Sequence, residues 1–290
     1  MTLPSAQYES ETAAGLRRTD RDGVVVAILD RPPANALNRT LLLAMTALFR
    51  DNGESNPPPV VTTGAGERFF CAGGDIKEVD GTTADPVKDR MRGFHNLLVA
   101  MDRYPAPVIA AVNGDCVGGG LEYALFADVV LAVPHARFGF PEIRHGLLPA
   151  DKGIQRLVRL TGIRPARELL LNGELVDAEQ AARWGLIDAI IEPSQLMAEA
   201  ISRAREAGRR APVLYAALKH AINDYDDIAD QKRADATLTK AASWFADPVA
   251  RSLRDGWRHA KASRPPAETM PGLKTAPYES PQRLHHEPER

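Results

Sequence analysis

Short runs of apolar residues, each ended by a turn residue, alternate with stretches of helical periodicity along the first two thirds of the chain. Such runs of β-branched and aliphatic residues between turns predict buried strands. The sequence has four of them, at residues 23–29, 60–63, 107–112 and 129–132. The segment 40–49 instead puts apolar side chains on one helical face, at Leu41, Leu42, Met45 and Leu48. Strands that alternate with helices predict an α/β architecture with mostly buried sheets.

The two ends of the chain differ from this central pattern. Residues 1–14 are polar and without period, which predicts a flexible N-terminus with ordered structure beginning near Gly23. Residues 195–262 have Ala-rich, charged helical periodicity and predict a helical C-terminal region. Residues 263–290, including an adjacent histidine pair, are rich in proline and charge and predict a disordered, solvated tail. The core of the fold is therefore expected at residues 15–194.

Composition excludes several classes of protein. The 290 residues are 44% hydrophobic, which is enough for a substantial core. A net charge of -2 gives no electrostatic reason to expect nucleic acid or an anionic membrane as partner. Cys71 and Cys116 form no CxxC pair and have no histidine cluster beside them, so neither a disulfide framework nor a metal site is expected. Because the sequence has neither a signal-peptide core nor a membrane-length apolar run, we expect a cytoplasmic protein.

Three consecutive glycines, Gly118, Gly119 and Gly120, stand directly before a helix-like stretch. Glycine costs about 0.5 to 1 kcal/mol in regular structure, so a run of three indicates more than a simple turn. At a helix start, glycines leave N–H groups free and unobstructed by Cβ atoms, at the positive end of the helix dipole. The run either packs a tight turn against another element or holds a negatively charged oxygen.

A second turn of small residues favours the interpretation that the glycine run holds a negatively charged oxygen. The segment 69–77, with sequence FFCAGGDIK, also follows a strand and is expected to enter a helix. Two such turns can each supply one N–H to a single oxygen, as in an oxyanion hole, where one donor contributes about 3 to 4 kcal/mol. Near such a hole, Glu122 and Glu142 are candidates for a general acid and base. Taken alone, Glu122 is equally a favourable charge at its helix N-terminus and Glu142 a turn residue.

At these residues the sequence resembles the enoyl-CoA hydratase/isomerase family, also called the crotonase superfamily. The resemblance covers residues 15–262 and rests on four segments in order: FFCAGGDIKE at 69–78, PVIAAVNGDCVGGGLEYALFADVVLA at 107–132, FGFPEIRHGLLP at 138–149 and LNGELVDAEQAARWGLIDAII at 171–191. It implies a crotonase-like α/β spiral of ββα units with a C-terminal helical trimerisation region. It also implies homotrimers, or hexamers made of two trimers.

The resemblance implies a thioester substrate and a role for each candidate residue. The N–H groups of Gly74 and Gly119 would polarise the thioester carbonyl so that an enolate can form. Family members with hydratase activity carry glutamates at the positions of both Glu122 and Glu142, where they hold the water added across the α,β double bond. Many isomerases and hydrolases retain only one of the two.

The partner implied by the resemblance is an acyl-CoA, with coenzyme A bound as part of the substrate and no separate cofactor or metal. The CoA portion is expected against Ala34, Ala72, Asp75, Ile76 and Lys77, with Lys77 close to a phosphate. Trp257 and Lys261 fall where the last helix of the family offers an aromatic residue and a base to the nucleotide, often from a neighbouring subunit.

The chain departs from the family after the second glutamate. Hydratases usually have Pro-Gly-Ala-Gly-Gly there, whereas residues 149–153 are PADKG and add two charges to a place normally left small. Asp151 either caps a helix over residues 152–160 or lies near the acyl pocket as a second base, as an acidic residue does in the family's dienoyl-CoA isomerases. His145 can titrate near neutral pH, but we expect it at the surface or in a subunit contact.

Retention of both glutamates favours hydration of an enoyl-CoA, or the reverse dehydration, in fatty acid or lipid metabolism. One alternative is another enolate-forming enzyme, an isomerase or a C–C bond hydrolase, in which Asp151 or His145 shares the chemistry. The other is a non-catalytic oligomeric binding protein, including an RNA-binding relative. Intact glycine turns and paired glutamates argue against the second alternative, and the absence of net positive charge argues against RNA. The acyl group itself is not fixed by the sequence, although its pocket is expected from residues 79–99 and the C-terminal helices.

Overall fold

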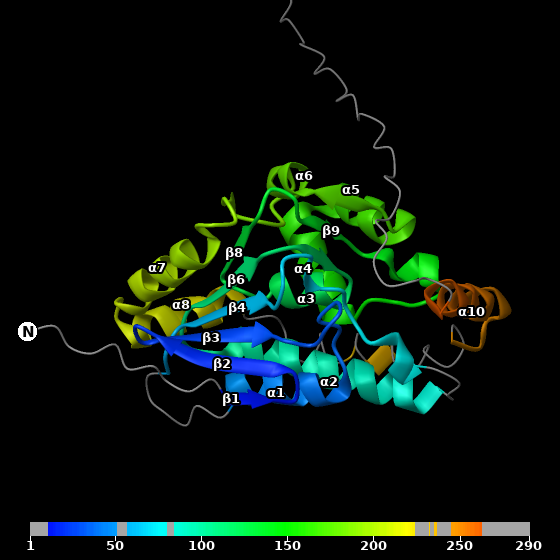
Figure 1. The fold of residues 1–290 in the computed structure, drawn as a ribbon, viewed down its shortest axis with the longest axis horizontal. Helices are drawn as coiled ribbons and strands as arrows, with labels where there is room; N and C mark the ends of the chain where they lie inside the picture. The colour runs from blue at the N-terminus through cyan, green and yellow to red at the C-terminus, as the bar shows by residue number, and fades with distance from the viewer. Residues whose placement is uncertain are drawn as a thin grey trace, which may run out of the picture.

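The computed structural model describes residues 11–50, 57–79, 84–223, 232, 235–236 and 245–262 (Figure 1). The predicted tail at 263–290 and residues 1–10 lie outside this part of the chain. The strands of the larger sheet are β1 (Glu11–Ala13), β2 (Leu16–Arg21), β3 (Val24–Leu29), β4 (Val60–Gly64), β6 (Val108–Val112), β8 (Val129–Ala132) and β11 (Ala189–Ile190), joined in that order. A smaller sheet has the order β10 (Leu175–Asp177), β9 (Arg137–Gly139), β7 (Asp115–Val117) and β5 (Phe69–Cys71).

Helices surround these sheets, so the predicted α/β class is confirmed. The α-helices are α1 (Arg39–Arg50), α2 (Ala84–Arg103), α3 (Gly119–Ala124), α4 (Asp151–Thr161), α5 (Ile163–Arg167), α6 (Ala178–Arg183), α7 (Leu196–Gly208), α8 (Pro212–Asn223) and α10 (Pro248–Ala262). Shorter helical turns are η1 (Ile76–Val79), η2 (Pro141–His145) and η3 (Glu168–Asn172). In Figure 1, α7 and α8 lie at one end of the molecule and α10 at the other. Within the described residues, none of these helices combines the length and the apolarity that crossing a membrane requires.

Four parallel strands, β3, β4, β6 and β8, form the centre of the larger sheet. Their side chains are almost all buried, which is why β3, β6 and β8 are continuous aliphatic runs and β4, with sequence VVTTG, contains no charged residue. The four predicted strands correspond to these four, and the predicted helix at 40–49 corresponds to α1. The core therefore contains the elements that were identified from unbroken apolar patterns.

Two expectations about local structure are wrong, and four short strands were missed. Ordered structure begins before Gly23, because β1 and β2 pair in antiparallel fashion ahead of β3, and the polar, partly exposed residues of β2 hide it from a hydrophobicity pattern. The turn after β5 leads into the short 3₁₀ turn η1 rather than a helix, with the N–H of Glu78 donated to the Asp75 carbonyl at 3.2 Å. Finally, β5, β7, β9 and β10 were not predicted, because strands of three residues show no period.

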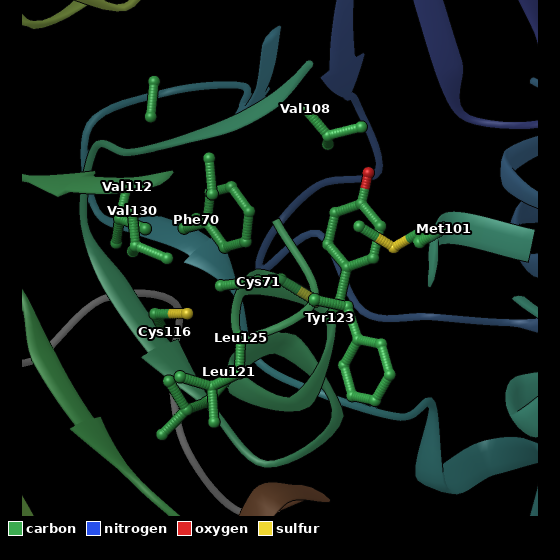
Figure 2. Close-up of a cluster of buried hydrophobic side chains, with 14 of the residues drawn as sticks. Phe70, Cys71, Met101, Val108, Val112, Cys116, Leu121, Tyr123, Leu125 and Val130 are labelled. Carbon is green, nitrogen blue, oxygen red and sulfur yellow. The ribbon is translucent and has the colours of Figure 1, made fainter. Parts of the chain in front are cut away.

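The smaller sheet fixes the start of α3 against β5. Figure 2 shows Phe70, Cys71 and Cys116 packed with Leu121 and Tyr123 of α3. The Phe70 and Tyr123 rings stack with centroids 6.2 Å apart, and both cysteines are buried free thiols. A well-packed apolar cluster of this kind holds the helix start in one position.

Candidate active site

The two glycine turns lie side by side because they follow neighbouring parallel strands. Strands β5 and β7 pair in parallel, so their carboxyl ends meet at one edge of the smaller sheet. A Cβ atom built on Gly119 would lie 3.6 Å from the backbone nitrogen of Gly74. The Leu37 N–H donates to the Gly73 carbonyl, and the Leu37 carbonyl accepts the Asp75 N–H. The Gly74 N–H, which lies between these two bonds, takes no part in this pairing. Among the described residues, neither the Gly74 N–H nor the Gly119 N–H has an acceptor, which leaves both available to one oxygen.

The three glycines before α3 each have a different structural reason. Gly118 has φ +56°, in the left-handed region, and a Cβ there would lie 2.5 Å from Oε1 of Glu142. Gly120 packs so closely on β5 that a Cβ would lie 2.3 Å from the Cys71 carbonyl oxygen. Gly119 lies between them and presents its amide at the first position of α3. The run thus makes a tight turn and leaves a free amide.

Glu122 enters the site from the first turn of α3 and is 2% exposed. Its Oε1 accepts the backbone N–H of Ala150 at 3.1 Å. A Cβ on Gly153 would lie 2.0 Å from its Oε2, so the carboxylate occupies space that only glycine leaves open. The residues before and inside α4 therefore hold the Glu122 carboxylate in place.

Glu142 lies on η2 with its carboxylate against Gly118. The residue is half-buried as a whole, but its Oε2 is buried and has no hydrogen-bond partner among the described residues. Burial raises the pKa of this carboxyl to about 7, although its own backbone N–H and the Arg90 guanidinium act in the opposite direction. A carboxyl with a pKa near neutrality can both accept and donate a proton in a catalytic cycle.

The residues expected to contact coenzyme A lie beside the hole. The Ala72 N–H donates to the Ala34 carbonyl at 3.0 Å, which brings these two backbone segments together. The Asp75 carboxylate accepts from Arg31 at 2.5 Å and from the Lys77 N–H at 3.0 Å.

Asp75 is tied into the protein rather than open to a ligand. Burial opposes its ionisation, but the Lys77 N–H and the Arg31 guanidinium hold its pKa below the ordinary value. The Lys77 side chain is exposed, whereas the side chain of Ile76 lies outside the described part of the chain. Contact of these residues with coenzyme A remains a prediction. The described residues contain no group of three or more His, Cys, Asp or Glu side chains arranged to hold a metal ion.

The sequence matches the family model described as Enoyl-CoA hydratase/isomerase over residues 19–252. This chain belongs to that family. It is 35% identical over 214 residues to a carnitinyl-CoA dehydratase of Salmonella arizonae, which covers 73% of this chain and 82% of that protein. It is 38% identical over 204 residues to a short-chain-enoyl-CoA hydratase of Clostridium acetobutylicum, which covers 69% of this chain and 77% of that protein.

Solved structures of the family have the same fold. An enoyl-CoA hydratase/isomerase from Xanthobacter autotrophicus Py2 aligns with a TM-score of 0.76 and 28% identity over 87% of this chain and 97% of its own. One from Mycobacterium paratuberculosis has a TM-score of 0.76 and 26% identity over 85% of this chain and 99% of its own. The predicted crotonase fold and family are therefore confirmed.

Of the two charges by which the chain departs from other family hydratases, the structure describes the side chain of Lys152. Lys152 is buried, and its Nζ lies 3.0 Å from Oδ2 of Asp102 on α2, where Arg156 also binds. Helix α4 begins at Asp151, with Ala150 as its N-cap, so the prediction that Asp151 caps the helix is wrong by one residue. The Ala150 N–H is held by Glu122, which fixes the chain just before the helix. The side chain of Asp151 lies outside the described part of the chain, so its role as a second base is untested.

The last helix covers the turn that carries Glu142. Trp257 of α10 stacks on His145 with ring centroids 4.1 Å apart, and Arg254 donates to the Gly146 carbonyl at 2.8 Å. His145 was expected at the surface or in a subunit contact, but it is half-buried against this chain's own C-terminal helix. The side chain of Lys261 lies outside the described residues.

Arg90 is a site residue that the sequence did not reveal. It comes from α2, within the segment expected to line the acyl pocket, and a Cβ on Gly74 would lie 1.3 Å from its Nη2. Burial lowers the pKa of its guanidinium, opposed by nearby carboxylates that include Glu142 and Glu122. Arg90 lies in a helix rich in exposed charges, and no motif marks which of them turns inward.

Proposed function

We propose that this protein is an enoyl-CoA hydratase, or the corresponding dehydratase, which adds water across the α,β double bond of an acyl-CoA thioester. The supporting observation is the combination at one place of two glutamates and two backbone N–H groups that have no acceptor within the described part of the chain. The names of the relatives in Salmonella arizonae and Clostridium acetobutylicum support the same class of reaction.

The glycine amides would activate the substrate. The thioester carbonyl oxygen accepts hydrogen bonds from the N–H groups of Gly74 and Gly119. When water attacks C3, negative charge moves onto this oxygen as an enolate, and the two fixed donors stabilise it. Removal of one such donor typically costs about 3 to 4 kcal/mol of transition-state stabilisation.

The glutamates would move the protons. The Glu122 carboxylate, held by the Ala150 N–H, takes a proton from water as the oxygen bonds to C3. Glu142, with its pKa of about 7, delivers a proton to C2 as the enolate collapses. Transfer of a proton from Glu122 back to Glu142 through water restores the starting state, so the net change is addition of one water molecule.

The direct test is loss of the conjugated enoyl-thioester absorbance with short, medium and aryl enoyl-CoAs. We expect loss of absorbance with a 3-hydroxyacyl-CoA as product, and at least a 100-fold slower reaction in Glu142→Gln, in line with the contribution of about 10²- to 10⁴-fold from one acid–base group. The control is Glu179→Gln, which removes an exposed carboxylate on α6, 3.8 Å from Arg183 and outside the turn that carries Glu142. Binding of acyl-CoA without loss of absorbance would refute hydration and favour an isomerase or hydrolase.

A further inference from the structure

The Arg90 guanidinium reaches into the site with most of its donors unused. Within the described residues its one hydrogen bond runs from Nη1 to the Asp75 carbonyl oxygen at 3.0 Å, and no carboxylate there forms an ion pair with it. A guanidinium has five N–H donors in a planar fork, and a cation that is partly removed from water is costly unless it is paired. Within the described residues, the half-buried Arg90 side chain therefore has no ion-paired anion.

Among the described residues, none of the neighbouring carboxylates accepts a hydrogen bond from the Arg90 side chain. Glu78 accepts the Arg39 N–H with both oxygens, at 3.0 and 2.9 Å. Asp75 is bound by Arg31 and by the Lys77 N–H. The glutamates of the site affect Arg90 through space, but neither is bonded to it.

The inward direction of Arg90 is built into α2 and the glycine turn. Phe94, one helical turn further along, is buried and has its Cζ 3.6 Å from the position of a Cβ on Gly119, so residues 90 and 94 share the face that covers the hole. Gly74 leaves open the space that Nη2 occupies. Two residues away, Arg92 points outward with its side chain 59% exposed and pairs with Asp89 at 3.2 Å.

We propose that Arg90 binds a carboxylate carried by the acyl chain, so that the substrate is the CoA thioester of a dicarboxylic acid. This inference rests on the proposed function only in taking the ligand to be an acyl-CoA. A carboxylate accepts two parallel N–H bonds from a guanidinium, a geometry that no neutral acyl chain offers. A carnitinyl group, with its quaternary ammonium, would instead place a like charge beside Arg90.

The test measures binding of three saturated thioesters by titration calorimetry at fixed ionic strength. Butyryl-CoA is neutral, glutaryl-CoA adds a carboxylate on C4, and γ-trimethylammoniobutyryl-CoA adds a cation there. None can be hydrated, so the result does not depend on the reaction. We expect glutaryl-CoA to bind about tenfold more tightly than butyryl-CoA, which is about 1.4 kcal/mol, and the cationic thioester to bind most weakly.

Three variants connect this preference to Arg90. Arg90→Gln is expected to reduce the glutaryl-to-butyryl affinity ratio to about one, and Arg90→Lys to keep part of it, because the charge remains but the planar fork is lost. The control Arg92→Gln removes the same charge from the exposed face of the same helix and should leave the ratio at its wild-type value.

Equal or weaker binding of glutaryl-CoA by the wild-type protein would overturn the inference, as would an unchanged ratio in Arg90→Gln. A third result would also overturn it: Arg90→Gln slows the turnover of all enoyl-CoAs equally and leaves the glutaryl-to-butyryl affinity ratio unchanged. Arg90 would then act on Glu142 or on the enolate. If no enoyl-CoA is hydrated but the Arg90-dependent preference is present, the proposed function fails and this inference stands.

Discussion

Glu142 holds its Oε2 in a buried position where ionisation is unfavourable, and this has a consequence for stability as well as for chemistry. Its pKa rises from 4.5 to about 7 in the folded protein. Folding therefore favours the protonated carboxyl. The favourable contribution is complete below the ordinary pKa and is lost as the pH rises through the folded value. Above that pH the charged carboxylate costs on the order of 3 kcal/mol.

Glu142→Gln should therefore stabilise the protein at high pH. We expect its free energy of unfolding to exceed that of the wild type by up to about 3 kcal/mol at pH 8, and by much less at pH 5, because the amide never ionises. Urea denaturation at the two pH values measures the difference. Glu179→Gln, at an exposed carboxylate on α6, is the control and should show no such pH dependence. An equal effect of Glu142→Gln at both pH values would contradict the raised pKa.

Several site residues could be predicted because local sequence determines them. Gly118 and Gly120 are needed for a positive φ and for close packing, and both needs are visible as a glycine run. The direction of Arg90 and the partner of Lys152 could not be predicted, because each depends on a contact with a distant segment. Asp102, the partner of Lys152, is 50 positions away in the chain, and no local pattern connects them.

At the scale of elements, α4 is joined to α2 by a buried ionic cluster. Asp102 on α2 receives Lys152 and Arg156 from α4, and all three side chains are largely buried. Burial raises the pKa of Asp102, although the two cations oppose this. Both cations also lie over the Phe126 ring, at 5.7 and 4.3 Å. The cluster sets the position of α4, and hence of the Ala150 N–H that holds Glu122.

Asp102→Asn should leave two buried cations without their carboxylate. We expect the free energy of unfolding to fall by about 3 to 5 kcal/mol, the usual effect of removing one partner of a buried ion pair. Asp89→Asn on the same helix removes an exposed pair with Arg92 and should cost less than about 1 kcal/mol. Thermal or urea denaturation of both variants tests this, and equal losses would show that burial of the cluster is unimportant.

The longer and more buried an element is, the more clearly the sequence predicts it. The parallel strands β3 and β6 are continuous aliphatic segments, so their pattern alone identifies them. Strand β2 has one buried residue in six, and β5 is only three residues long, so neither carries a periodic signal. Their pairing is decided by distant partners, which a single sequence does not display.

At the scale of the whole molecule, α8 presents an apolar stripe to solvent. Leu214, Leu218 and Ile222 recur every four residues and are 65%, 65% and 77% exposed. They also line a cavity of about 660 Å³ between α8 and the rest of the chain. Contiguous exposed apolar side chains are typical of protein–protein contacts, in agreement with the predicted homotrimer or dimer of trimers.

We expect light scattering to give three or six times the mass of the 31.5 kDa chain. Leu218→Asp should shift the protein to monomers, because it buries a charge in the contact. Leu43→Asp is the control, since Leu43 is 61% exposed on α1, outside this stripe. A monomeric wild-type protein at micromolar concentration would contradict the assembly.

The turn that carries Glu142 has two supports, and they are synthesised at different times. Arg144 bonds the Asn172 carbonyl at 2.7 Å and Glu174 at 2.8 Å, so the first support is formed from the middle of the chain. The second is α10, through Trp257 and Arg254. A nascent chain that has left the ribosome only as far as α8 already contains both glycine turns and both glutamates. The turn that carries Glu142 gains its second support only after translation reaches the last helix.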